Sequence, residues 1–323
     1  MYAHKGYHIG DAWYFVDDDA NIVHMFYLTE PMSGDGTPFV GHAISEDLLD
    51  WKRLAPALET EPPGAWDDLR ICTGSVIKRN ARYWLAYAAT STLDSSPEEP
   101  WRFQRAGMAV SDDLISWQKL PENPMTQAGP PYYEEMSTGQ RKMVHWRDPF
   151  LFDTGEVVYQ FLCARRNEGE LATRGTVAVT RSTDMRRWEV LAPLEHDRVS
   201  EEMEVPQVYL INGRWYLVFC TLGRLLGPEF AKRFAGGPPE RINLCMVGDS
   251  PLGPFHIHGT GQIVQYPPNY HFYAAQLVNF KGAWYLLATI HDGASEWISD
   301  PLPVYADGSG LHANLSSNSS PQS

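Results

Sequence analysis

Three acidic residues have surroundings in which a carboxylate could do chemistry. Asp148 lies in the triplet Arg147-Asp148-Pro149 within an apolar, aromatic run, Glu204 is followed by a Val-Pro pair, and Asp11 lies near the N-terminus. A buried charge is costly unless it is paired or used in function, so a salt bridge at a strand end would explain the Arg-Asp pair alone. Three converging carboxylates are instead suited to glycoside hydrolysis, which needs a proton donor, a nucleophile or base, and a group that orients sugar hydroxyls.

A repeated segment that ends in tryptophan indicates how such residues could be brought together. Ala43–Trp51 recurs as Ala109–Trp117 and Val179–Trp188, with a degenerate copy at Met246–Phe255. In the three clear copies a serine precedes the tryptophan by six residues, and successive copies are roughly 65 to 70 residues apart. Ser-x-Asp-Leu-x-x-Trp is suited to a hairpin connection, because Ser and Asp can bond the turn backbone while Leu and Trp pack beneath.

A second repeated element is a strand-like segment, rich in aromatic and β-branched residues, that follows a turn. It occurs five times, at Asn21–Leu28, Asn80–Tyr87, Glu156–Leu162, Asn212–Phe219 and Lys281–Leu287. Each unit therefore indicates a small antiparallel sheet, with an inner strand, the aromatic strand, a strand ending at the repeated serine and an outer strand. Radial repetition of these sheets predicts an all-β fold, a five-bladed β-propeller in a single domain over residues 1–313, followed by a disordered Ser/Asn-rich tail over 314–323.

The central funnel of a propeller is lined by its innermost strands, so residues on those strands converge although they are far apart in sequence. Asp11, Asp148 and Glu204 each precede an aromatic strand by a comparable stretch, which predicts equivalent places in three blades. Glu201 and Glu202 compete with Glu204 for the role of acid, but they lack the flanking proline.

Composition excludes several classes of partner. The 323 residues carry a net charge of −14, which argues against binding of nucleic acid or an anionic membrane. No apolar run approaches the roughly 20 residues of a membrane span, and the N-terminus lacks the pattern of a signal peptide, so a cytoplasmic location is expected. The four cysteines are expected to be buried, reduced thiols without zinc-ligand spacing. No cofactor or metal is predicted, the expected partner is a small carbohydrate, and the oligomeric state stays open.

The ordered set of motifs resembles the five-bladed propeller glycosidases of glycoside hydrolase family 32 and the related families 43 and 68. The matching segments are Gly41–Trp51 with that group's Gly-His-Ala-x-Ser…Asp-Leu…Trp, Cys72–Val76 with its Ser-Gly-Ser strand, Trp146–Pro149 with Arg-Asp-Pro, Glu204–Gln207 with Glu-Cys-Pro-Asp, and His271–Gln276 with Asp-Phe-Tyr-Ala-Pro-Gln. The resemblance implies that Asp11 is the nucleophile, that Asp148 binds sugar hydroxyls and stabilises the transition state, and that Glu204 is the acid/base.

Further site residues follow from charge, from aromatic character and from the matched motifs. Arg147 is expected to hold Asp148 in its charged state, and apolar neighbours are expected to raise the pKa of Glu204. The expected sugar contacts are Arg147, the aromatic residues Trp13, Trp66, Trp146 and Tyr273, and the polar residues Asp67, Asp68, Ser75 and Gln276. For the two aspartates a turn role is the alternative, and most of the other tryptophans are expected in the core between blades.

The resemblance favours an exo-acting glycosidase that cleaves a terminal furanoside, above all a β-fructofuranoside, with retention of configuration. An inverting arabinofuranosidase or xylosidase of the family 43 type is one alternative. The chain also departs from the family pattern, with Gly10-Asp11-Ala12 in place of Asn-Asp-Pro, and Val205 and Gln207 in place of Cys and Asp. These departures motivate a second alternative, a non-catalytic carbohydrate-binding propeller. Only the tail follows Leu311, so the β-sandwich that usually follows the family 32 propeller is expected to be absent.

Overall fold

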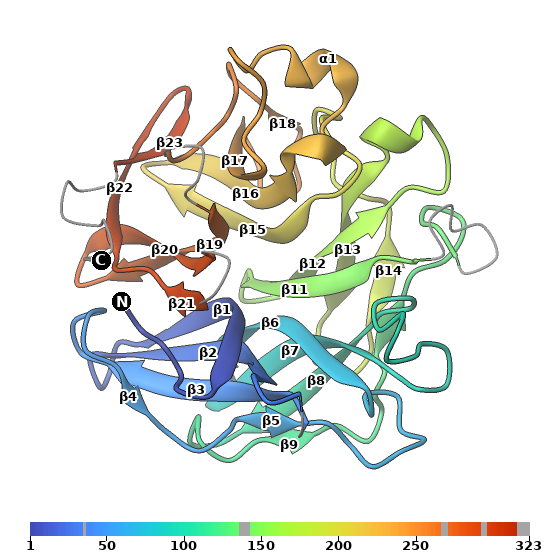
Figure 1. Ribbon diagram of the computed structural model, residues 1–323, viewed down its shortest axis with the longest axis vertical. Coiled ribbons are helices and arrows are strands. Elements are labelled where there is room, and N and C mark those ends of the chain that lie inside the picture. Colours follow the sequence, from blue (N-terminus) through green and yellow to red (C-terminus); the bar gives the residue numbers. More distant parts are fainter. Residues whose placement is uncertain (35–36, 136–142, 266–270, 292–295, 315–323) are drawn as a thin grey trace.

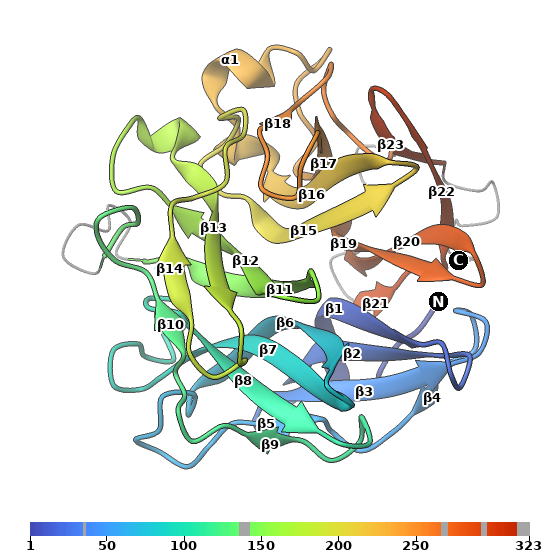
Figure 2. The ribbon, with the colours of Figure 1, turned by 180° about the vertical axis from the view of Figure 1, so that it is seen from behind.

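The computed structural model describes residues 1–34, 37–135, 143–265, 271–291 and 296–314. Five antiparallel sheets are arranged around a central axis as the blades of a propeller (Figures 1 and 2). The prediction of an all-β, five-bladed propeller is thereby confirmed. The predicted tail falls on residues 315–323, which lie outside the described residues, and on Asn314, which directly follows the last strand.

The strands follow the blades in chain order. Blade one contains β1 (Tyr7–Asp17), β2 (Ile22–Pro31), β3 (Phe39–Ser45), β4 (Lys52–Arg53) and β5 (Leu58–Glu59). Blade two contains β6 (Arg70–Arg79), β7 (Arg82–Thr90), β8 (Arg105–Ser111), β9 (Gln118–Lys119) and β10 (Thr126–Gln127). Blade three contains β11 (Trp146–Asp153), β12 (Val158–Arg165), β13 (Gly175–Ser182) and β14 (Glu189–Leu191).

Blade four contains β15 (Glu204–Ile211), β16 (Arg214–Leu222), β17 (Arg241–Gly248) and β18 (Phe255–His256). Blade five contains β19 (His271–Phe280), β20 (Ala283–His291), β21 (Glu296–Ile298), β22 (Leu302–Asp307) and β23 (Gly310–Ala313). In the described connections lie three short helical segments, namely the 3-10 helices Leu171–Thr173 and Gly223–Leu225 and the helix α1 (Pro228–Ala231). Among the described residues no helix is both long enough and apolar enough to span a membrane.

The repeated serine forms the predicted turn between the third strand and the outer strand. In blade one the Ser45 Oγ accepts a hydrogen bond from the Leu48 amide at 2.9 Å, and the Asp47 carboxylate accepts two more amides of the turn. The same set recurs at Ser111 and at Ser182. Leu48 takes a positive φ of 65°, which these side-chain bonds hold in place. The repeat is therefore structural in these three blades.

The core lies between the blades, where the aromatic strands pack face to face. Trp13 of β1 is fully buried and stacks on Phe26 of β2, with ring centroids 6.1 Å apart, in the cluster that joins blades one and two. Another cluster, which includes Phe161 and Phe219, joins blades three and four. All four cysteines are buried and free, as predicted.

Contacts between blade five and the start of the chain close the ring. Tyr2 pairs with Ile298 of β21 through two backbone hydrogen bonds of 3.0 and 2.8 Å. Deeper in the same seam, the Thr289 hydroxyl of β20 donates to the carbonyl of Gly10 at 3.0 Å. Blade one is thus fixed to blade five at Gly10, the residue directly before Asp11.

Candidate active site

A β-bulge interrupts each of the five innermost strands, β1, β6, β11, β15 and β19, at the same level of the propeller. In every case two residues of the inner strand oppose one residue of its partner; the inner pairs are Gly10-Asp11, Cys72-Thr73, Asp148-Pro149, Val205-Pro206 and Ala274-Ala275. A bulge re-aims side chains and is common next to active sites. Asp148, Val205 and Ala274 take positive φ values of 57°, 50° and 50°, a conformation that non-glycine residues rarely adopt. The inner strands thereby direct side chains into the central funnel.

The three predicted catalytic carboxylates occupy three different positions of the bulge. Asp11 is the second bulged residue of β1, Asp148 is the first bulged residue of β11, and Glu204 directly precedes the bulge of β15. The prediction that the three carboxylates occupy equivalent places in their blades is therefore wrong in detail. The side chains converge because the bulges lie at one level.

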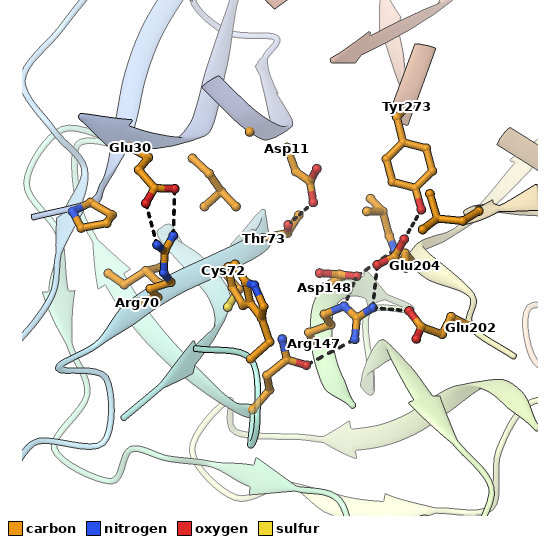
Figure 3. A pocket seen from close by; sticks show the side chains of 18 of the residues that line it. Asp11, Glu30, Arg70, Cys72, Thr73, Arg147, Asp148, Glu202, Glu204 and Tyr273 are labelled. Atoms are coloured by element: carbon orange, nitrogen blue, oxygen red, sulfur yellow. Dashed lines mark hydrogen bonds and ion pairs between the residues drawn. The ribbon is translucent and has the colours of Figure 1, made fainter. Parts of the chain in front are cut away.

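Asp11, Asp148 and Glu204 line one central pocket of about 530 Å³, together with Arg147 and Tyr273 (Figure 3). All five inner strands contribute to its wall. A pocket of this size with a few convergent polar groups suits a small ligand.

Glu204 is held by two donors from neighbouring blades. Arg147 Nη2 donates to Glu204 Oε1 at 2.6 Å, and the Tyr273 hydroxyl donates to Oε2. Burial raises the pKa of Glu204 above its ordinary value, although the Arg147 charge acts to lower it. A carboxyl group that keeps its proton towards neutral pH is suited to general acid catalysis.

Asp11 is fixed through one of its two oxygens. The Thr73 hydroxyl of β6 donates to Asp11 Oδ2 at 2.7 Å, while Oδ1 accepts no hydrogen bond among the described residues. Burial raises the pKa of Asp11, and the Thr73 hydrogen bond and the nearby cations oppose this effect. An oriented carboxylate with one unengaged oxygen is suited to nucleophilic attack.

Asp148 is held by the backbone of the next blade. Its Oδ2 accepts a hydrogen bond from the Val205 amide at 2.9 Å and lies 3.6 Å from Arg147 Nε. Burial raises the pKa of Asp148 to about 7, with Asp11 and Glu204 adding to the rise and Arg147 opposing it. Arg147 acts in the expected direction, because its charge lowers the pKa of Asp148, but burial has the larger and opposite effect.

The sequence profile described as Glycosyl hydrolases family 32 N-terminal domain matches residues 17–285. The chain belongs to glycoside hydrolase family 32. The matched range includes Asp148, Glu204 and Tyr273 but begins after Asp11, so the role of Asp11 rests on its place in the pocket.

Known proteins resemble this chain in sequence or in fold. The sucrose-6-phosphate hydrolase of Bacillus subtilis is 24% identical over 214 residues, which are 62% of this chain and 39% of that protein. The chain thus spans about two fifths of the length of this relative. Inulosucrase from Halalkalicoccus jeotgali, bound to kestose, has a TM-score of 0.75 at 17% identity, covering 97% of this chain and 88% of that one. The GH32 beta-fructofuranosidase of Bombyx mori has a TM-score of 0.69 at 20% identity, covering 97% and 65%. At these identities both structures show the shared fold.

Of the tryptophans predicted to stack on sugar in this family 32 propeller, none lines the pocket. Trp13 and Trp146 are fully buried between blades, and Trp146 Nε1 donates to the Thr126 hydroxyl at 2.9 Å. Trp66 is half-buried and packs on Tyr87, with ring centroids 5.3 Å apart. Tyr273 does line the pocket, although its hydroxyl is engaged by Glu204.

The predicted polar contacts, apart from Arg147, also lie outside the pocket wall. Asp67 is fully buried and bound by Tyr87 at 3.0 Å and by Lys119 at 2.7 Å. Asp68 accepts hydrogen bonds from Thr92 and from a glycine amide, which is a turn role. Gln276 is buried on β19 and is not part of the lining.

Ser75 joins blades two and three instead of contacting a ligand. Its hydroxyl donates to the carbonyl of Pro149 at 2.7 Å and accepts from the Leu151 amide at 2.8 Å. The Ser75→Ala variant leaves two buried backbone groups of β11 without partners, so unfolding in urea should show a loss of about 1 to 3 kcal/mol. Ser309→Ala removes an exposed turn hydroxyl that bonds Asp307 and should stay within about 0.5 kcal/mol. Equal effects of the two variants would refute the role assigned to Ser75.

Several pocket residues were not predicted from the sequence, or were given a lesser role in the prediction. Glu202 lines the pocket two residues before Glu204. On the opposite wall, Arg70 is paired with Glu30 at 2.6 and 3.1 Å and lies 5.2 Å from the centre of the Trp101 ring (Figure 3). Trp101 is 37% exposed and lies in the connection from β7 to β8. The described residues contain no cluster of His, Cys, Asp or Glu suited to a metal ion.

Proposed function

We propose that this family 32 propeller is an exo-acting glycosidase that hydrolyses a terminal β-fructofuranoside with retention of configuration. The observation that carries the proposal is the set of three carboxylates on three blades of one pocket. Asp11 has an unengaged oxygen, and Glu204 is a half-buried acid with two donors. A pocket enclosed by five inner strands suits the end of a saccharide better than its middle.

In the first step of the proposed reaction, Asp11 Oδ1 attacks the anomeric carbon while Glu204 donates its proton to the glycosidic oxygen. The bond to the leaving group breaks, and a glycosyl ester of Asp11 forms. In the second step, the Glu204 carboxylate takes a proton from water, and the resulting hydroxide equivalent displaces Asp11. Asp148 accepts hydrogen bonds from sugar hydroxyls, which strengthen as positive charge develops on the ring.

A substrate panel with an anomeric readout tests the proposal. Sucrose, sucrose 6-phosphate, short fructans, and aryl fructofuranosides, arabinofuranosides and xylosides are incubated with the protein, and the first product anomer is followed by NMR. Initial release of the β-anomer of fructose supports the proposal. Initial inversion would favour the family 43 type of mechanism, and saccharide binding without any turnover would favour a carbohydrate-binding propeller.

A cytoplasmic location is also proposed. Four buried free thiols are compatible with a reducing compartment. Fractionation of source cells with an antibody against the propeller tests this location.

A further inference from the structure

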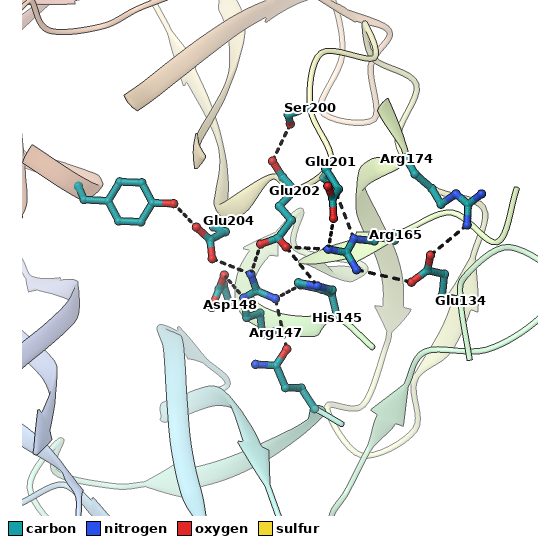
Figure 4. A network of polar contacts seen from close by, with 12 residues as sticks. Glu134, His145, Arg147, Asp148, Arg165, Arg174, Ser200, Glu201, Glu202 and Glu204 are labelled. Atoms are coloured by element: carbon teal, nitrogen blue, oxygen red, sulfur yellow. Dashed lines mark hydrogen bonds and ion pairs between the residues drawn. The ribbon is translucent and has the colours of Figure 1, made fainter. Parts of the chain in front are cut away.

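Glu202 shares the cation that holds the proposed acid. The nitrogen Arg147 Nη2 donates both to Glu202 Oε2, at 3.0 Å, and to Glu204 Oε1, at 2.6 Å (Figure 4). Arg147 Nε also lies 3.6 Å from Asp148, so three carboxylates face one buried guanidinium group.

The other oxygen of Glu202 is anchored on the far side. Arg165 Nη2 donates to Glu202 Oε1 at 2.7 Å, and His145 Nε2 lies 3.4 Å from the same oxygen. Arg165 is itself fully buried and is held by Glu201 at 2.8 Å (Figure 4). Only 14% of the Glu202 side chain is exposed. This anchoring fixes the carboxylate of Glu202 against Arg147.

The two glutamates differ in their remaining partners. Glu202 contacts two guanidinium groups, whereas Glu204 shares one of them and otherwise meets the uncharged Tyr273 hydroxyl. When like charges compete for a limited number of cations, the proton goes to the site with the weaker positive surroundings. The arrangement therefore favours a proton on Glu204.

We propose that Glu202 is a positioning residue for Glu204, which it serves by orienting Arg147 and by taking part of its positive charge. The inference rests on the proposed role of Glu204 as acid/base. Without Glu202, Arg147 would be shared only with Asp148, so more of its positive charge would act on Glu204 and stabilise its ionised form.

Some of the groups that face Glu204 from the surrounding elements raise its pKa, and others lower it. These groups are Arg147 and Asp148 of β11, Cys163 of β12, Glu202 before β15, Cys220 of β16, Tyr273 of β19, and Asp11 of β1 through its coupling to Asp148. Glu202 raises the pKa of Glu204, and Arg147 lowers it. Removal of Glu202 changes one charge in this set and leaves the others in place.

Direct titration of Glu204 tests the proposal without requiring turnover. Glutamate is labelled with 13C at the side-chain carboxyl, and the Glu204 signal is identified by its loss in Glu204→Gln. In Glu202→Gln, whose amide oxygen can still accept from Arg147, the pKa of Glu204 should fall by about one pH unit. Glu30→Gln removes the same charge from the same pocket, but its partner is Arg70, so it should shift Glu204 much less.

Two further readouts separate a positioning role from a structural role or a sugar contact. The basic limb of the kcat/KM profile should move to lower pH by the same amount as the NMR titration. Glu202→Asp keeps the charge and should leave Glu204 closer to the wild type, which guards against a misfolded glutamine variant. If the Glu204 titration is unchanged in a folded Glu202→Gln variant, the inference is overturned. This holds even if the KM of that variant is raised. A wild type that turns over no glycoside refutes the proposed function, and the titration still decides the role of Glu202.

Discussion

Replacing Asp11 by asparagine is expected to lower kcat on the order of 10⁴-fold or more, because an amide cannot form the glycosyl ester. The substitution keeps the shape of the side chain and an oxygen that can accept from Thr73. Rapid acid quenching and intact-protein mass spectrometry should detect one added glycosyl residue on the wild type and none on the variant. Asp18→Asn, which changes an exposed acid beyond the end of the same strand, should retain full activity.

The same variant should be at least as stable as the wild type at neutral pH. A carboxyl group whose pKa is raised by burial takes up a proton on folding, so its ionised form disfavours the folded state at higher pH. Asparagine removes that cost, and the thermal midpoint at pH 7 should rise or stay equal. An inactive variant with unchanged or increased stability would separate loss of the nucleophile from loss of the fold. Retention of a tenth or more of the activity would exclude Asp11 as nucleophile.

Replacing Glu204 by glutamine is expected to lower kcat for sugar leaving groups by about 10²- to 10⁴-fold, which is the usual contribution of general acid catalysis. The loss in the first step should be much smaller for an aryl fructofuranoside, whose leaving group needs no proton. Added azide should then restore turnover, because an anion can attack the glycosyl ester without a general base. Steady-state kinetics over pH would also lose the basic limb of the profile.

Tyr273→Phe is the matched comparison for Glu204→Gln. It removes one donor from Glu204 and keeps the carboxyl group, so it should lower activity less and retain the basic limb. Glu204→Gln could instead lose the same fraction of kcat on aryl fructofuranosides as on substrates with sugar leaving groups, without rescue by azide. That result would assign Glu204 a binding role instead of proton transfer.

The blades could be predicted from the sequence because their signals are local. The serine turn uses hydrogen bonds within six residues, and the aromatic strands follow turn residues at regular intervals. The pocket depends on the bulges, which have no such local code. A bulge shifts the alternation of side chains along a strand, so the pattern alone cannot tell which residues face the funnel. For this reason Trp13, two residues after Asp11, was predicted at the site and lies in the core.

Glu202 illustrates a second limit of prediction from the sequence. It was set aside as the acid in favour of Glu204 because it lacks a flanking proline, and this criterion says nothing about charge partners. Its contacts are with Arg147 and Arg165, which are 55 and 37 residues away along the chain. Only the folded ring brings these groups together.

The assembly of the pocket from separate blades means that activity can serve as a measure of ring closure. Asp11, Asp148 and Glu204 belong to three different sheets, and Thr73 and Tyr273 belong to the other two. A single cut anywhere between Asp11 and Glu204 therefore places the proposed nucleophile and the proposed acid on different fragments. Two such halves would regain turnover only when they reassociate with the correct register, which makes this propeller a natural candidate for fragment complementation.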